Sequence, residues 1–383
     1  MKLRISDCGL QNINLGRETI SSFRRRTPSH QPSIVLRPSS LVSRLSSLIS
    51  ISILLSLMLF FLSILKPVPV SADQVILKIG TLAPEGSSWV KAFRDINQEL
   101  AKKTGNQVVI RIFPGGVLGD EEDMLRKIKV GQIQGGFFSG GGLGLIFKDI
   151  KILVIPSLFE NYKEVDAVLN KMGPYFEKGI LDNGFKIMGW SESGFIYLYS
   201  KHPIKNAADL RKGKVWIWED TAIGRAVFKE LGVNGIPLGI PDVLVSLQTG
   251  MIDTVYASPA AAISMQWFTR VSYMTDVPLS YSVGAAVLHR SAFEKIPPAL
   301  RATVEEVFRR HLALLKENVR KEDQKAISVL AKQGIKIISP NAIEVKEMQA
   351  LSMKGVDTLG EDVFPKKTLA ETKALLKTLR KEN

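Results

Sequence analysis

Aromatic and acidic residues recur in several short segments of this 383-residue sequence, and side chains of these types can hold a small ligand. The face of a tryptophan or tyrosine stacks on rings and attracts cations, and a carboxylate pairs with a cation or accepts hydrogen bonds from hydroxyl groups. Ordinary core positions for half of the tryptophans, and solvated strand ends for the acids, are the alternative interpretation. We predict a ligand pocket that draws on Glu85, Trp89, Glu192, Trp216, Trp218, Glu219, Tyr256 and Ser258.

Residues for enzymatic chemistry are sparse after residue 72. The histidines there are His202, His289 and His311, which are far apart in the sequence and form no H-E-x-x-H motif, and the single cysteine is Cys8. This part of the sequence therefore lacks the residues that a zinc site, histidine-based catalysis or thiol chemistry would need. We expect a protein that is not an enzyme and uses no cofactor or metal; a glycosidase that uses Glu85 and Glu219 is the enzymatic alternative.

Residues 135–144 form a glycine-rich run, GGFFSGGGLG. The run has neither the G-x-x-x-x-G-K-[ST] pattern of a phosphate-binding loop nor the G-x-G-x-x-G spacing of a dinucleotide fold, and no capping signal is evident in the residues that follow it. A strand end whose backbone lies open to a cleft accounts for the glycines better than a nucleotide site does.

Strands and helices alternate along the chain after residue 73. The β-rich runs Val75–Gly80 and Val108–Phe113 are each followed by a helical pattern, at residues 89–100 and 120–130, and Ser87 and Ser88 offer an N-cap for the first helix. This order predicts a parallel sheet with helices on its faces. A second series, at residues 184–268, predicts a second α/β lobe, and a cleft between lobes is a usual place for a small ligand.

The N-terminal 72 residues have the parts of a secretory signal peptide. Residues 48–65 are uncharged, the flank before them is basic, and small residues at 70–72 suit cleavage after Ala72. This segment has a net charge of +7, which is half of the total of +14. Half of the net charge therefore belongs to the predicted export signal and does not indicate what the protein binds. An uncleaved membrane anchor is the alternative, because an uncharged run of 18 residues is at the lower limit for a spanning helix.

The basic residues of the remaining chain do not predict a nucleic-acid interface. Pairs such as Arg309 and Arg310 or Lys366 and Lys367 fall in helical segments, without the interleaved aromatic residues of a nucleic-acid site. We expect them on solvated helix faces.

Four motifs lie in the same order as in a known family. They are G-T-x-A-P-x-G-S-x-W at residues 80–89, I-L-x-I-P-x-L-F at 152–159, D-L-x-x-G-K-V at 209–215 and L-Q-T-G-M-I-D at 247–253. With these motifs the chain resembles the DctP-type solute-binding subunits of TRAP transporters.

The resemblance implies an α/β, two-lobed fold like that of periplasmic binding proteins, with a ligand cleft between the lobes and a long C-terminal helical segment. We expect lobe I at about residues 73–195 and 277–300, lobe II at about 196–276, and C-terminal helices at about 297–383. Such a protein works in the periplasm, has no stable membrane insertion after cleavage, traps a small organic solute by lobe closure and delivers it to the TRAP permease membrane subunits. A ligand-sensing partner of a signalling receptor is the alternative function.

The sequence departs from the family where many members hold an organic acid. The resemblance would place a carboxylate-binding arginine in the strand K-V-W-I-W at residues 214–218, where Trp216 stands, and a second arginine near Ile196. Trp216 and Trp218 should share one face of that strand, because side chains alternate along a strand. A simple sugar acid or dicarboxylate is therefore not the expected ligand, although Arg225 on the next helix offers another partner for a carboxylate.

Overall fold

The computed structural model describes residues 52–58, 60, 74–218 and 221–382. Ala72 with most of the predicted leader, and also Glu219, lie outside the described residues. Residues 1–70 and 71–383 form separate units, and the fold below is that of the second unit. Among the described residues, no helix has the length and apolar character needed to cross a membrane.

Within the described residues, seven strands form one mixed sheet in the order β2-β1-β3-β8-β4-β7, with β9 paired to β8. The strands β1, β2 and β3 at one end pair parallel, as the order of strands and helices in the first series predicted. The sheet continues with antiparallel pairs between β3, β8, β4 and β7, which the sequence did not indicate. The strands are β1 (Val75–Gly80), β2 (Val108–Phe113), β3 (Gly135–Ser139), β4 (Phe185–Ser200), β7 (Thr254–Ala257), β8 (Tyr273–His289) and β9 (Lys336–Ile338).

Two long strands, β4 and β8, run through the whole unit. The sequence pattern predicts two short strands, at residues 185–189 and 195–199, but β4 is one strand of 16 residues that continues across three register shifts. Gly194, with φ of +93°, makes one of these bulges possible. In a larger irregularity Leu198 pairs with Thr275 while Ile196 pairs with Ser280, so residues 276–279 of β8 bulge out between the paired positions.

Helices cover the β1, β2 and β3 end of the sheet. The first, α2 (Ser88–Lys103), begins at the predicted N-cap Ser87, and α3 (Glu121–Lys129) begins with a capping box made by Asp120 and Asp123. A helix that the sequence did not indicate starts inside the glycine run, because the Ser139 hydroxyl accepts hydrogen bonds from the backbone N–H groups of Gly141 and Gly142. The other elements here are α4 (Gly140–Ile146), η1 (Lys148–Val154), α5 (Tyr162–Asp182) and α10 (Arg290–Glu294).

A smaller group of elements lies between β4 and β8 in the sequence. Its strands β5 (Trp216–Trp218) and β6 (Ile236–Leu238) form a separate parallel pair. Gly250 ends α8 (Ile240–Thr249) in the left-handed conformation, as its position in the sequence predicts. The other elements are α6 (Ala207–Leu210), α7 (Ala222–Glu230), α9 (Pro259–Ser264) and η2 (Trp267–Arg270).

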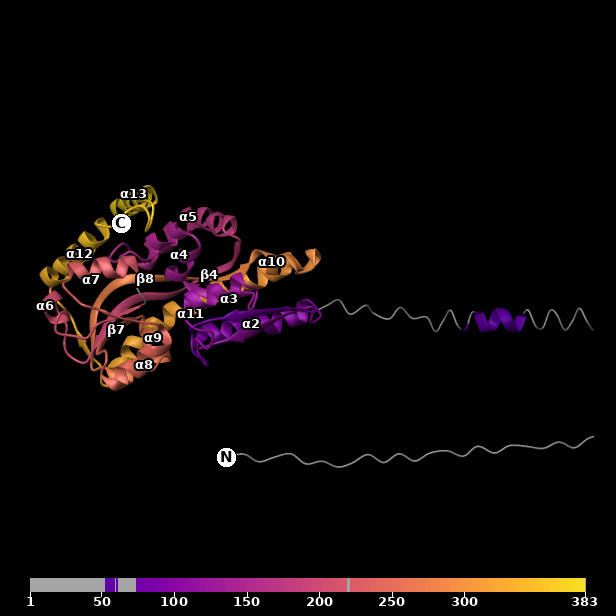
Figure 1. Ribbon diagram of the computed structural model, residues 1–383, viewed down its shortest axis with the longest axis horizontal. Helices are drawn as coiled ribbons and strands as arrows, with labels where there is room; N and C mark the ends of the chain where they lie inside the picture. The colour runs from indigo at the N-terminus through magenta and orange to yellow at the C-terminus, as the bar shows by residue number, and fades with distance from the viewer. Residues whose placement is uncertain (1–51, 59, 61–73, 219–220, 383) are drawn as a thin grey trace, which may run out of the picture. The chain divides into compact units, whose positions relative to one another are not determined.

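The C-terminal part is helical and contacts both groups of elements (Figure 1). The 35-residue helix α11 (Pro298–Lys332) packs on α2, β4 and α9. Beyond β9, α12 (Ala342–Asp357) packs on α7, and α13 (Lys366–Glu382) packs on α5 and η1. Phe93 of α2 packs edge to face on Phe137 of β3 and Phe308 of α11, so α11 belongs to the core.

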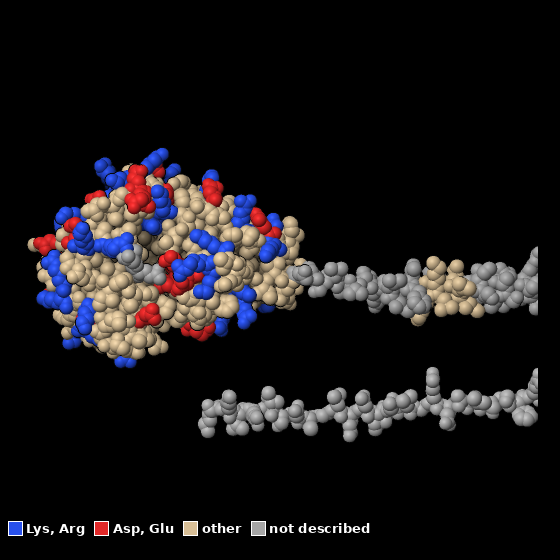
Figure 2. Space-filling model, viewed as in Figure 1, with Lys and Arg blue, Asp and Glu red and all other residues tan. Residues whose placement is uncertain are grey.

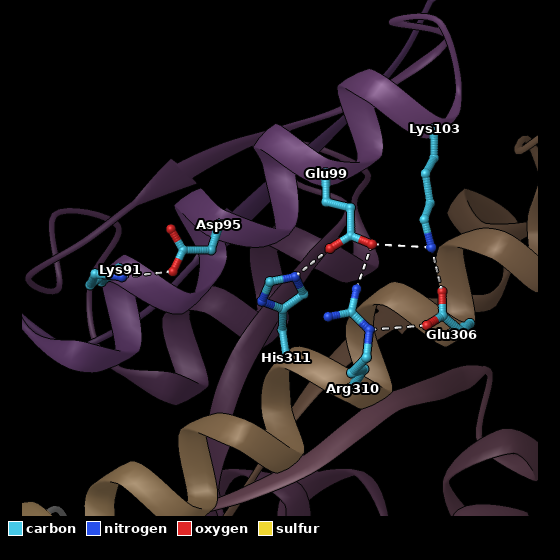
Figure 3. A network of polar contacts seen from close by, with 7 residues as sticks. All are labelled: Lys91, Asp95, Glu99, Lys103, Glu306, Arg310 and His311. Carbon is cyan, nitrogen blue, oxygen red and sulfur yellow. Dashed lines mark hydrogen bonds and ion pairs between the residues drawn. The ribbon is translucent and has the colours of Figure 1, made fainter.

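An outer charge cluster ties α2 to α11 at the protein surface (Figure 3). Glu99 of α2 accepts from Arg310 of α11 and lies 2.8 Å from Nε2 of His311, and Lys103 contacts both Glu99 and Glu306. Hydrogen bonds from Arg310 and His311 lower the pKa of Glu99 to about 2. The space-filling view shows other Lys and Arg side chains scattered among Asp and Glu (Figure 2).

Candidate functional site

A cavity of about 640 Å³ lies between the two groups of elements. Its walls include Thr81 and Pro84 after β1, residues of the β8 bulge, and residues of α3, α4, β5, α7 and α12. Gly141 and Gly142 line it, so the glycine run lies against the cavity as the sequence indicated. The volume is within the range of small-molecule pockets, roughly 300 to 1,000 Å³.

Aromatic rings form one wall of the cavity. Trp216 stacks on Tyr256 with ring centroids 4.7 Å apart and lies 6.5 Å from Trp218, while Trp267 meets its edge at 5.3 Å. All four residues line the cavity, although Trp216 is only 1% exposed and is also part of the core. The structure thus brings Trp216 and Trp218 to one side of their strand.

Polar groups of Trp216 and Tyr256 are engaged within the protein. The indole Nε1 of Trp216 donates to the carbonyl of Leu238 at 2.9 Å, and the backbone N–H of Trp218 donates to the Tyr256 hydroxyl at 2.9 Å. Burial raises the pKa of Tyr256 to about 12, so the phenol stays neutral. This wall therefore offers a ligand mainly ring surface rather than hydrogen bonds.

Asp120 connects the two sides of the cavity. Its carboxylate accepts from Nε1 of Trp218 at 3.2 Å and from the backbone N–H of Ile240 at 2.8 Å, while it also caps α3. One side chain therefore links α3 to β5 and α8. The sequence placed Asp120 only at the start of a helix, because its partners lie about a hundred residues away.

Trp89 and Ser258 also line the cavity, as predicted from the sequence. Trp89 donates from its indole Nε1 to the carbonyl of Glu192 at 3.1 Å. The Ser258 hydroxyl accepts from the backbone N–H of Ala261 and caps α9. Both side chains thus hold the wall in place as well as face the cavity.

Two of the predicted acids, Glu85 and Glu192, are not among the described residues that line the cavity. Glu85 is exposed and pairs with Arg94 at 2.8 Å, and Glu219 lies outside the described residues. Glu192 is fully buried behind the wall. The placement of Glu85 and Glu192 on the cavity wall is therefore corrected: each has a charged partner elsewhere.

Glu192 belongs to an inner charge cluster with Asp166, Tyr281 and Arg320. Arg320 of α11 donates to Glu192 at 2.8 and 2.9 Å and to Asp166 at 2.7 and 2.9 Å, and the Tyr281 hydroxyl donates to Glu192 at 2.7 Å. Burial opposes ionisation of Asp166, but the hydrogen bonds from Arg320 outweigh it and hold its pKa below the ordinary value. Because Tyr281 lines the cavity, this cluster supports the wall from behind.

Glu121 is an acidic wall residue that the sequence did not single out. Its carboxylate accepts from the backbone N–H of Ser139 at 2.5 Å and from the Ser139 hydroxyl at 2.8 Å, and burial raises its pKa to about 8. A Cβ on Gly142 would come within 2.5 Å of this carboxylate, which explains a glycine there. In the sequence, Glu121 looked like one of the acids that favour a helix N-terminus.

Lys151 is a cationic wall residue that the sequence also missed. It lies on η1, and no hydrogen bond or ion pair within the described part of the chain engages its ammonium group. Burial lowers its pKa, while the carboxylate of Asp362 acts in the opposite direction. The stem of the side chain packs on Gly144, where a Cβ would lie 2.4 Å from Lys151 Cγ. Arg225 of α7 lines the cavity too, from an exposed position.

The cavity lies between two groups of elements, and the long strands β4 and β8 connect these groups. This arrangement is that of a two-lobed solute-binding protein. Residues 79–361 match the family described as bacterial extracellular solute-binding protein, family 7, the DctP family. This match spans most of the sequence, and the chain belongs to that family. Its members are extracytoplasmic solute receptors that work with membrane permease subunits and are not enzymes.

Individual relatives are distant but similar over most of their length. A solute-binding protein of Verminephrobacter eiseniae is 25% identical over 70% of this chain and 80% of its own. The 2,3-diketo-L-gulonate-binding periplasmic protein YiaO of Escherichia coli is 22% identical over 69% and 80%. The crystal structure of the sugar acid binding protein DctPAm from Advenella mimigardefordensis, in complex with galactonate, has a TM-score of 0.75 at 18% identity and covers 80% of this chain and 99% of that one. The predicted family and two-lobed α/β fold are confirmed.

Proposed function

We propose that this chain binds a small organic anion in the cavity, acts without chemical turnover, and passes the solute to the membrane subunits of a TRAP-type permease. It does so in the periplasm, after removal of the leader at Ala72. The lobe limits near residues 195, 277 and 300 belong to the same proposal. Lobe closure over the solute is supported by Asp120, whose hydrogen bonds already span the two sides of the cavity.

The observation that carries this proposal is a half-buried lysine, Lys151, on the wall of an otherwise mostly apolar cavity. Relatives are named for 2,3-diketo-L-gulonate or hold galactonate, and both are organic acids. A carboxylate in such a site needs a cationic partner, because an unpaired buried charge is costly. Trp216 occupies the position expected for the family's arginine, and Lys151, which also lines the cavity, offers a replacement charge. Trp89, Trp216, Trp218, Tyr256 and Ser258 remain proposed ligand contacts.

Tryptophan fluorescence tests the proposal, because four of the five tryptophans line the cavity. Galactonate, succinate, orotate, hexanoate and octanoate form the titration panel. We expect at least one to change the emission in a saturable way, and to be recovered chemically unchanged after incubation. If none of these anions binds, the proposed ligand class is wrong; turnover of a bound anion would refute the proposal of binding alone.

Lys151→Met tests the anionic part, with Lys148→Met as the matched control. Lys148 lies one turn earlier, is exposed, and donates to the carbonyl of Glu361. Loss of a charge-assisted hydrogen bond should weaken binding about tenfold or more in Lys151→Met, since such bonds contribute about 1.5 to 3 kcal/mol. Lys148→Met should bind like the natural protein. Equal affinity in both variants would exclude Lys151 as the anion partner.

A further inference from the structure

One face of α12 is built into the cavity wall. Val345, Met348, Gln349 and Ser352 all line the cavity, and their spacing of three and four residues places them on one side of a helix. Lys346, Glu347 and Ala350, on the other sides, are exposed. The helix therefore presents a defined surface to the cavity rather than lying across it at random.

The cavity surface beside α12 is apolar. It is formed by Val227 and Leu231 at the end of α7 and by Leu210 at the end of α6, and all three are buried and line the cavity. Of the two polar residues on the α12 face, Ser352 already donates its hydroxyl to the carbonyl of Met348 at 2.8 Å. We call this part of the cavity, between α6, α7 and α12, the apolar chamber.

The structure holds α12 firmly in this position. At Gly355 the two helices approach so closely that a Cβ would lie 2.6 Å from the carbonyl oxygen of Ala226 in α7. A capping box of Asn341 and Glu344 fixes the start of the helix, and Lys354 pairs with Glu230 of α7 at 2.8 Å. The apolar chamber is thus a part of the folded unit, with a wall from the C-terminal segment.

The following helix fixes the other end of this segment. Thr368 of α13 donates to Asp149 of η1 at 2.9 Å, and Arg380 donates to Glu164 of α5 at 2.7 and 2.8 Å. The C-terminal segment is therefore attached on both sides of the cavity, to α7 through α12 and to α5 and η1 through α13. A wall anchored in this way keeps its shape when a solute lies against it.

From this arrangement we infer that the solute carries an apolar chain or ring, and that the apolar chamber receives it. The inference rests on the proposed function and narrows its ligand class from organic anions to amphipathic ones. A polyhydroxylated acid would leave hydroxyl groups without partners against Val227, Leu231 and Met348, which is costly. An apolar chain gains free energy for each methylene that leaves water.

A series of straight-chain carboxylates from butanoate to decanoate tests the inference, by calorimetric titration of the purified protein. Each methylene that enters the chamber should lower Kd by roughly three- to fourfold, until the chamber is full. An affinity that stays flat along the series overturns the inference. If galactonate or succinate binds but no alkanoate does, the inference fails while the proposed function stands; if no anion of either panel binds, both fail.

Gln349→Phe and Glu347→Phe form a matched pair on α12. The first adds a ring on the cavity face, and the second adds the same ring on the exposed side. Gln349→Phe should weaken decanoate at least tenfold more than it weakens butanoate, whereas Glu347→Phe should change neither. Equal losses for short and long chains in Gln349→Phe would overturn the inference. If that variant does not fold, Gln349→Glu replaces it, because a charge facing the chamber should select against long chains in the same way.

Discussion

The inner and outer charge clusters both join α11 to other elements, but they lie in different surroundings. In the inner cluster Glu192 is fully buried and the Arg320 side chain is 19% exposed. In the outer cluster Glu99 is 24% exposed and its partner Arg310 is 44% exposed. The same kinds of charged groups therefore meet little water in one place and much water in the other.

This difference decides what each cluster does. An exposed ion pair gains little, because water and salt screen it and long side chains lose freedom. A buried charge costs several kcal/mol to desolvate, so losing its partner is severe even where the pair adds little net stability. The inner cluster therefore fixes the positions of β4, α5, β8 and α11 behind the cavity, and the outer cluster adjusts the stability of one surface.

The largest expected effect is that of Glu192→Ala. The change leaves the Arg320 guanidinium with Asp166 alone and removes the acceptor of the Tyr281 hydroxyl, so the free energy of unfolding should fall by about 3 to 5 kcal/mol. Urea unfolding measures this fall. The double variant Glu192→Leu with Arg320→Leu removes both charges and should recover part of the loss. If Glu192→Ala lowered the free energy of unfolding by less than about 1 kcal/mol, the inner cluster would behave like an exposed ion pair.

Asp323, which also lies on α11, has a buried carboxyl group whose effect on stability depends on pH. Its Oδ1 accepts from the backbone N–H of Ala260 at 2.9 Å, and this bond and the hydroxyl of Tyr162 lower its pKa, but burial outweighs them and raises the pKa to about 7. The carboxylates of Glu192 and Glu322 act in the same direction. The folded state then holds a proton that the unfolded state has lost, so this group lowers stability as pH rises from about 4 to 7.

Asp323→Asn should remove this dependence and keep the contact with Ala260. Melting temperatures between pH 4 and 8 compare the two proteins. The natural protein should lose stability relative to the variant as pH rises through this range, and the two curves should run parallel above it. Parallel curves over the whole range would show that Asp323 is ionised in the folded protein throughout.

Local features of the fold were predictable from the sequence. Ser87 caps α2 and Gly250 ends α8, because each feature depends on a few neighbouring residues. The bounds of β1 and β2 also match the predicted runs. The antiparallel pairing of β4 and β8 was not predictable in this way, since it joins segments about a hundred residues apart and crosses bulges that break the sequence pattern.

The residues of the candidate site also fall into those that the sequence indicated and those that only the fold brings together. Trp216, Trp218 and Tyr256 lie close in the fold because their strands adjoin, and their residue type marked them in the sequence. Glu192 was expected at the pocket, but its role depends on Arg320, which is 128 positions later. Lys151 and the α12 face carry no local motif, so only the folded chain shows that they line the cavity.

The smallest expected effect is that of Glu99→Gln in the outer cluster. The pKa of Glu99 is about 2 in the folded protein against an ordinary 4.5, so its contribution is present above pH 4.5 and disappears as pH falls from about 4.5 to 2. At neutral pH the variant should lose only about 1 kcal/mol or less, since the partners are exposed. Acid unfolding curves at low salt measure the difference. The control is Lys91→Ala, which breaks the exposed pair with Asp95 and should lower the free energy of unfolding by about 0.5 kcal/mol at most. A loss in Glu99→Gln as large as that in Glu192→Ala would contradict the ranking, because burial would then not be what separates the two clusters.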